Sequence, residues 1–159
     1  YHLHPPGSLW VAGELADYVG SLISTAGGSG NYNGKVIGAE ISPDLMGTIT
    51  ELTSGGGVNK YGSFSLTIDF NSANTPPVTG SFAWDQGFGG FSIDPAGSSV
   101  SGTGFAATFS GATSSAINGA FYGPASGTYG LPGSIGGNFH AEETAGGKHY
   151  IGIFGGDLQ

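Results

Sequence analysis

The chain has 159 residues, of which 33 are glycine, and it carries 11 acidic side chains against three lysines and no arginine. The net charge of -8 excludes nucleic-acid binding, because contacts to phosphates need lysine and arginine side chains. The absence of cysteine excludes disulfides, thiolate metal sites and cysteine-linked lipids within this sequence, and no apolar run approaches the ~20 residues of a transmembrane helix.

The N-terminal residues differ in pattern from the rest of the chain. Residues 1–12 are expected to form an extended arm, because the segment His4-Pro5-Pro6-Gly7 is incompatible with a helix. The only helical pattern follows, with acidic residues early and Gly27-Gly28 at its end. Its apolar stripe consists of Leu15, Val19, Leu22 and Ile23. We therefore predict an arm plus a short helix over residues 1–30 and a β-barrel domain over residues 31–159.

Short alternations of apolar and polar residues dominate from Gly34 onward. The clearest runs from Tyr61 to Phe70, and its apolar face consists of Phe64, Leu66, Ile68 and Phe70. The predicted strands cover residues 35–41, 46–52, 61–70, 78–84, 91–94, 99–102, 104–110, 116–122, 134–142 and 149–155. Eight to ten short strands, with a turn signal about every ten residues, favour an up-and-down barrel or a sandwich.

Glycine is frequent inside these strands, where it weakens a strand unless the backbone must curve or pack closely against a large side chain. The chain also has 10 Phe, 7 Tyr and 2 Trp, which is enough aromatic mass to fill a core. We therefore predict an all-β protein: an antiparallel eight-stranded up-and-down β-barrel, with one short N-terminal helix and an extended N-terminal arm. Alternating glycine and phenylalanine would fill the interior of a barrel of this size with side chains.

Residues 31–159 resemble one known family. The most specific segments are Gly119–Pro124, which reads Gly-Ala-Phe-Tyr-Gly-Pro, and Gly136-Gly137-Asn138-Phe139 after a short loop. Weaker similarities are Tyr32-Asn33-Gly34, Ser65–Phe70, Val78–Phe82, Ser101–Phe105 and Ile153-Phe154-Gly155. Together these segments resemble the C-terminal β-barrel of the transferrin-binding protein B family.

The resemblance implies a non-enzymatic, secreted or cell-surface binding module that works in the acquisition of iron, haem or a host protein. It implies a location outside a Gram-negative bacterium or on its outer surface, and the periplasm also stays open. The acidic, cysteine-free composition is common in such proteins, and the first residue, Tyr1, indicates a processed chain or a fragment. The alternative is a structural subunit of a surface complex that uses the N-terminal arm for subunit contacts.

Four histidines are candidate ligands. His140 and His149 come from neighbouring predicted strands, and the family resemblance implies haem as a possible cofactor at this pair. His2 and His4 lie in the predicted arm, where a His-x-His pair near a free N-terminus can bind a metal such as copper(II). The opposing interpretation is that all four are ordinary surface side chains.

The sequence shows no constellation typical of an enzyme, such as a nucleophile elbow, a phosphate loop or a paired carboxylate site. Aromatic residues near predicted turns and in the arm are better candidates, since rings at strand ends can anchor a protein partner or a second copy. These candidates are Trp10, Tyr18, Tyr32, Tyr61, Phe88 and Tyr129. The same rings can instead close the ends of a barrel, and both interpretations stay open.

Overall fold

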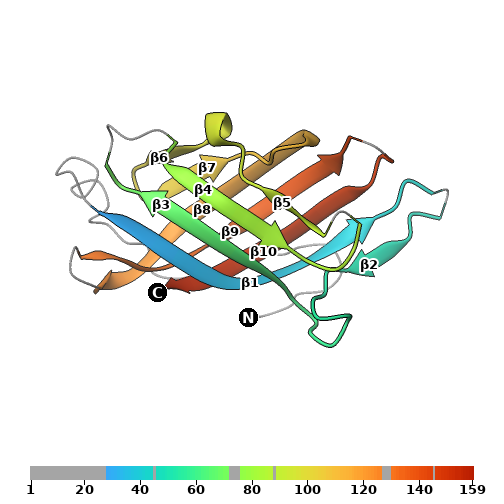
Figure 1. The fold of residues 1–159 in the computed structure, drawn as a ribbon, viewed down its shortest axis with the longest axis horizontal. Helices are drawn as coiled ribbons and strands as arrows, with labels where there is room; N and C mark the ends of the chain where they lie inside the picture. Colours follow the sequence, from blue (N-terminus) through green and yellow to red (C-terminus); the bar gives the residue numbers. More distant parts are fainter. Residues whose placement is uncertain (1–27, 45, 72–75, 88, 127–129, 145) are drawn as a thin grey trace.

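The computed structural model describes residues 28–159 except 45, 72–75, 88, 127–129 and 145 (Figure 1). The predicted arm and N-terminal helix lie outside the described residues. The strands are β1 (Ser29–Ile41), β2 (Ile49–Glu51), β3 (Gly62–Asp69), β4 (Val78–Ala83), β5 (Gly90–Ser92), β6 (Ser99–Ser101), β7 (Gly104–Ala107), β8 (Ala112–Ser126), β9 (Leu131–Glu143) and β10 (His149–Leu158). A 3-10 turn, η1 (Pro95–Gly97), precedes β6.

All ten strands belong to one antiparallel sheet in the order β5-β4-β3-β1-β10-β9-β8-β7-β6, with β2 paired to β1 off this path. Strand β1 is long enough to serve three partners. It pairs with β10 from Tyr32 to Ile41 on one edge, and with β3 and then β2 on the other. The chain is therefore a meander whose first and last strands lie side by side, as Figure 1 shows.

The prediction of a closed eight-stranded barrel is not confirmed. The sheet has ten strands, and its path ends at β5 and β6, each only three residues long. These edges approach each other where Ile93 forms an isolated antiparallel bridge with Phe109, next to a hydrogen bond of 2.8 Å from the Asp94 N–H to the Thr108 carbonyl. Pro95, which has no N–H, follows at once and helps to end the ladder. The result is a strongly curled sheet with a seam between β5 and β6.

Aromatic rings fill the interior of the curled sheet. The Phe82 ring lies at its centre, with ring centroids of Phe64, Phe109, Phe139 and Phe154 between 5.2 and 5.6 Å away. Most of these contacts are edge-to-face or tilted, which are the arrangements that aromatic quadrupoles favour. The expected face of β3 is confirmed, because Phe64, Leu66, Ile68 and Phe70 are all buried.

Glycines inside the strands make room for these rings. A Cβ atom at Gly119 would collide with the Phe105 ring, and one at Gly152 would lie 2.6 Å from the Phe139 ring. Both glycines lie in long strands, β8 and β10, where a side chain would otherwise be normal. The close approach of backbone and ring that the sequence indicated is therefore present.

Candidate functional site

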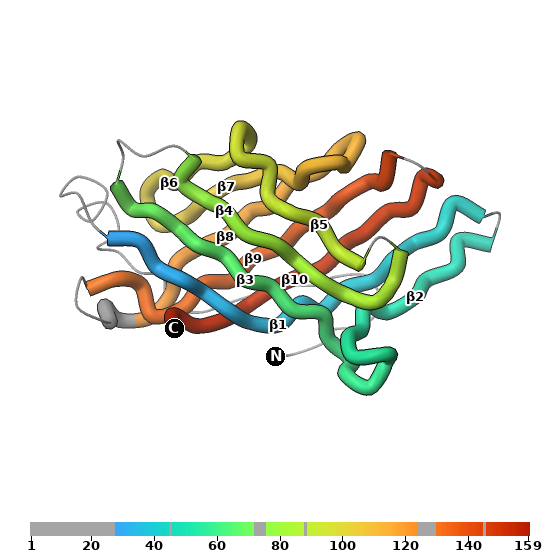
Figure 2. Tube along the Cα trace, in the orientation of Figure 1, coloured from blue at the N-terminus to red at the C-terminus, as the bar shows by residue number. Residues whose placement is uncertain are grey.

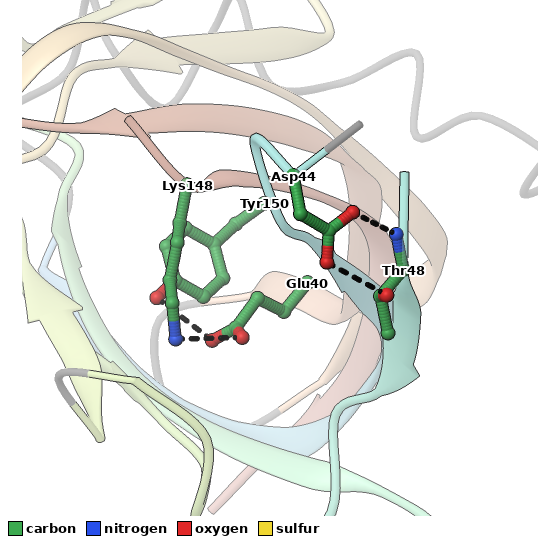
Figure 3. Close-up of polar contacts among 5 residues, drawn as sticks. All are labelled: Glu40, Asp44, Thr48, Lys148 and Tyr150. Carbon is green, nitrogen blue, oxygen red and sulfur yellow. Dashed lines mark hydrogen bonds and ion pairs between the residues drawn. The ribbon is translucent and has the colours of Figure 1, made fainter. Parts of the chain in front are cut away.

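A buried carboxylate lies inside one end of the curled sheet. Glu40, near the end of β1, is only 5% exposed because it shares the inward face of that strand with Val36. Its Oε1 accepts a hydrogen bond of 2.8 Å from the Lys148 Nζ, and its Oε2 accepts one of 3.0 Å from the Tyr150 hydroxyl (Figure 3). The hydrogen bond to Glu40 raises the pKa of Lys148 above its usual value. We name Glu40, Lys148 and Tyr150 the polar plug.

Aromatic rings and the turn between β4 and β5 pack against the polar plug. Tyr150 is fully buried, and its ring centroid lies 5.5 Å from that of Trp84 and 5.4 Å from that of Phe91. The turn between β4 and β5 covers the carboxylate, since a Cβ atom on Gly87 would collide with the Tyr150 hydroxyl and lie 2.7 Å from the Glu40 Oε2. Two hydrogen bonds thus compensate the buried charge of Glu40, because a buried charge without partners is strongly unfavourable.

The turn between β1 and β2 is held by its own side chains. The Thr48 N–H donates to the Asp44 Oδ1 at 3.0 Å, and the Thr48 hydroxyl donates to the Asp44 Oδ2 at 2.8 Å (Figure 3). These hydrogen bonds, the backbone one first, lower the pKa of Asp44. The turn presents Met46, whose side chain is 90% exposed.

The loop between β2 and β3 is tied to the turn between β4 and β5. The Gly57 N–H donates to the Asp85 Oδ2 at 3.0 Å, and the Thr53 N–H donates to the Gln86 Oε1 at 2.8 Å. This loop carries Val58, which is 83% exposed. At its end, Tyr61 is 41% exposed, and the Lys35 Nζ lies 5.0 Å from the centroid of its ring, a cation–π contact.

Most of the large exposed apolar side chains lie on β2 and on the two connections that flank it. Within the described part of the chain, the large exposed hydrophobic residues are Met46, Ile49, Val58, Tyr61 and Ile151. Four of them come from residues 46–61, and Ile151 lies on β10 directly beside β1. Figure 2 shows the β1–β2 turn and the loop before β3 at the end of the molecule that also holds the β9–β10 turn. We name Met46, Val58 and Tyr61 the loop corner.

The aromatic residues that the sequence suggested as partner-binding candidates differ in their exposure. Tyr61 is exposed as expected. Tyr32 does not lie at the surface where it could anchor a partner, because it faces inward on β1, is fully buried and donates from its hydroxyl to the Pro132 carbonyl at 3.0 Å. The remaining aromatic candidates, Trp10, Tyr18, Phe88 and Tyr129, lie outside the described residues, as do the metal candidates His2 and His4.

His140 and His149 are both exposed and lie on the outer face of the sheet. His140 is paired with Ile151, and His149 with Glu142, so the two histidines are diagonal neighbours on β9 and β10, about 7–8 Å apart by strand geometry. The sequence correctly placed them on adjacent strands. Haem binding at this pair stays a prediction, and among the described residues no group of three histidine or acidic side chains can hold a metal ion.

Sequence reasoning missed the polar plug and two residues of the loop corner. The one signal for Glu40 was its place on the same alternating face as Val36, where a charge is out of keeping with an apolar interior. Its partner Tyr150 lies 110 positions away, and no local pattern connects the two. Met46 and Val58 lie in turns, where apolar residues carry no periodic signal.

The curled antiparallel sheet with rings inside and ordered loops at one end defines the class of the fold, that of the barrels in transferrin-binding proteins. Comparison of the sequence with protein-family models gives no match, and comparison with curated proteins gives none either. Among solved structures, transferrin-binding protein B from serogroup B Neisseria meningitidis is similar, with a TM-score of 0.56 and 16% identity, covering 94% of this chain and 27% of that one.

Two further structures of transferrin-binding protein B are similar to this chain. A double mutant from Haemophilus parasuis has a TM-score of 0.55 and 17% identity, covering 84% of this chain and 26% of that one. The intact Ap protein, with N and C lobes, has a TM-score of 0.53 and 18% identity, covering 84% of this chain and 27% of that one. The resemblance seen in the sequence is confirmed as a likeness of fold, and this chain spans about a quarter of the length of these proteins.

Proposed function

We propose that this chain is a non-enzymatic binding module that holds a protein partner at the loop corner. The observation that carries the proposal is the exposure of Met46, Val58 and Tyr61 on loops that hydrogen bonds keep in place. Exposed apolar and aromatic side chains on a preorganised surface are typical of protein interfaces, because little conformational entropy is lost on binding. The shared fold supports this class, since the similar structures are named for binding transferrin.

The module works in the acquisition of iron, haem or a host protein, outside a Gram-negative bacterium or on its surface. Support comes from the fold, from the acidic, cysteine-free composition and from the Neisseria and Haemophilus origin of the similar proteins. None of the helices in the described part of the chain is long and apolar enough to cross a membrane.

Binding to immobilised transferrin, in iron-loaded and iron-free forms, tests the proposal. The chain with Met46→Ser and Val58→Ser should bind at least about tenfold more weakly than the unaltered chain, because central apolar contacts contribute more than ~1 kcal/mol each. Both residues are almost fully exposed, so the melting temperature should stay unchanged. The control is Ser81→Ala, an exposed position on β4 away from these loops.

Equal binding by the unaltered chain and the Met46→Ser and Val58→Ser variant would contradict the loop corner as the binding surface. Absence of any binding to transferrin would exclude transferrin as the partner. A haemin titration then tests the remaining ligand: an absorbance band near roughly 400 nm that His140→Ala and His149→Ala abolish would support haem binding at that pair. No response to either probe would overturn the acquisition role.

A further inference from the structure

Five isoleucines form an apolar surface on the outside of the curled sheet. On β1 and β10 the inward positions include Val36 and Phe154, so the alternate positions face outward. Cross-strand register places Ile37 opposite Ile153, Ala39 opposite Ile151 and Ile41 opposite Ile49. We name Ile37, Ile41, Ile49, Ile151 and Ile153 the isoleucine patch.

The isoleucine patch differs from the rest of the outer surface. Outward positions on the neighbouring strands are polar, such as Ser63 and Ser65 on β3 and Asn138 and His140 on β9. A contiguous outward apolar surface across three strands is not needed for the core, which lies on the other face of the sheet. A contiguous apolar surface on the outer face of a sheet is typical of an interaction site.

Burial within the isoleucine patch is graded. Ile153 is only 5% exposed although it does not belong to the core cluster, whereas Ile151 is 43% and Ile49 is 69% exposed. Cross-strand neighbours on the same face shield part of an outward side chain, and a layer over the sheet shields the rest. The gradient points to a cover over the centre of β1 and β10 that thins toward β2.

We propose that the N-terminal segment of the same chain, residues 1–27, docks on the isoleucine patch. The segment ends next to Ser29, where β1 begins. Ile37 is eight residues further along β1, about 26 Å at 3.3 Å per residue, which is well within the reach of 27 residues. The segment before β1 is therefore long enough to reach the isoleucine patch.

The composition of residues 1–27 complements the isoleucine patch. It offers the apolar run Leu9-Trp10-Val11 and the stripe that begins at Leu15. Its charged side chains are Glu14 and Asp17, and it has no lysine, while Lys35 lies on the outward face of β1 two positions before Ile37. This inference is independent of the loop corner, since docking needs neither Met46 nor Val58.

Introduced cysteines test the docking directly, because the natural sequence has none and, within one chain, two new thiols can pair only with each other. Full-length chains would carry Ile151→Cys together with Trp10→Cys, Leu15→Cys or Val19→Cys. Ile151 is partly exposed and tolerates the change. The control carries Ser81→Cys, also on the outer surface, with the same N-terminal cysteines.

Under mild oxidation at low protein concentration, at least one Ile151→Cys pair should form an intramolecular disulfide at least tenfold faster than the corresponding Ser81→Cys pair. Equal rates for both would overturn the proposal. Disulfide-linked dimers in place of crosslinked monomers would show instead that a second copy occupies the patch.

A second measurement does not require a disulfide to form. In a Trp84→Phe chain, Trp10 is the only tryptophan, and iodide should quench its fluorescence weakly while it is docked. Adding Ile37→Asp and Ile151→Asp should raise the quenching constant severalfold, whereas Ser81→Asp should not. Strong quenching of Trp10 without those aspartates would contradict docking.

Discussion

Gly87 gives the most direct test of the polar plug. It has a φ of +55°, a region that is strained for residues with a Cβ atom, and a Cβ atom there would collide with the Tyr150 hydroxyl. Gly102, in the turn between β6 and β7, has almost the same φ of +57° but nothing within 4 Å of the corresponding position. Substitution by alanine therefore has the same backbone cost at both glycines, but only at Gly87 would the new methyl group collide with a neighbouring side chain.

The expected magnitudes follow from this comparison. Gly102→Ala should cost about 1 kcal/mol of unfolding free energy, the backbone cost alone. Gly87→Ala should cost an additional ~2 kcal/mol, because it forces the Tyr150 hydroxyl off a charged acceptor, and such hydrogen bonds contribute about 1.5–3 kcal/mol. The Tyr150 ring has little freedom to yield, since Trp84 and Phe91 pack against it.

Urea unfolding, followed by tryptophan fluorescence and circular dichroism, measures the unfolding free energy of both variants. In thermal unfolding, the additional ~2 kcal/mol lost by Gly87→Ala should lower the melting temperature by roughly a further 4–8 °C. In a Tyr150→Phe background the hydroxyl that the new methyl group would strike is gone, and the close contact that remains is with the Glu40 Oε2, the end of a flexible side chain. The extra cost of Gly87→Ala over Gly102→Ala should therefore be smaller in that background than in the natural one. Equal losses for the two glycine variants in the natural background would refute the packing of Gly87 over the plug.

Two further predictions concern the plug and the core. Glu40 raises the pKa of Lys148, so the stability from this ion pair is fully present below the usual lysine pKa of 10.5 and is lost as the pH rises through the raised value. Thermal unfolding in alkaline buffers should show this loss in the natural chain and a flatter dependence of the melting temperature on pH in Lys148→Gln. The same dependence in both chains would contradict the prediction. Phe82→Ala should cost about 3–5 kcal/mol in urea unfolding, because Phe82 is 1% exposed and contacts four other rings, whereas its outward neighbour Ser81→Ala should change stability by less than ~0.5 kcal/mol. A loss below ~1 kcal/mol for Phe82→Ala would place that ring outside the core.

The fold was most predictable where alternation was uninterrupted. The predicted strand over residues 61–70 is observed as Gly62–Asp69 with its expected buried face. In the predicted strand over residues 104–110, the alternate residues Phe105, Ala107 and Phe109 are all buried. The longest strands were underestimated. β8 extends over Ala112–Ser126, and β1 begins at Ser29, because glycines hide the period-two signal even where the backbone continues as a strand.

Closure and side-chain direction were harder to predict. Nothing near Phe91 or Val100 shows that the sheet is interrupted between β5 and β6, because that depends on curvature summed over all strands. On β1, hydrophobicity alone favours Ile37 and Ile41 as the inward face, yet Val36 and Glu40 face inward. The choice is set by register with β3 and β10, which single-sequence periodicity does not contain.

The pairing of β1 with β10 has a consequence for the order in which the protein is made. Glu40 on β1 leaves the ribosome 110 residues before Tyr150, the residue opposite it on β10. Until β10 follows, one whole edge of β1 has no hydrogen-bonding neighbour, and contacts over such a sequence separation form slowly. The nascent chain must therefore be kept from aggregating until β10 has been made, and synthesis that stops before His149 would yield a sheet without the strand that joins its two halves.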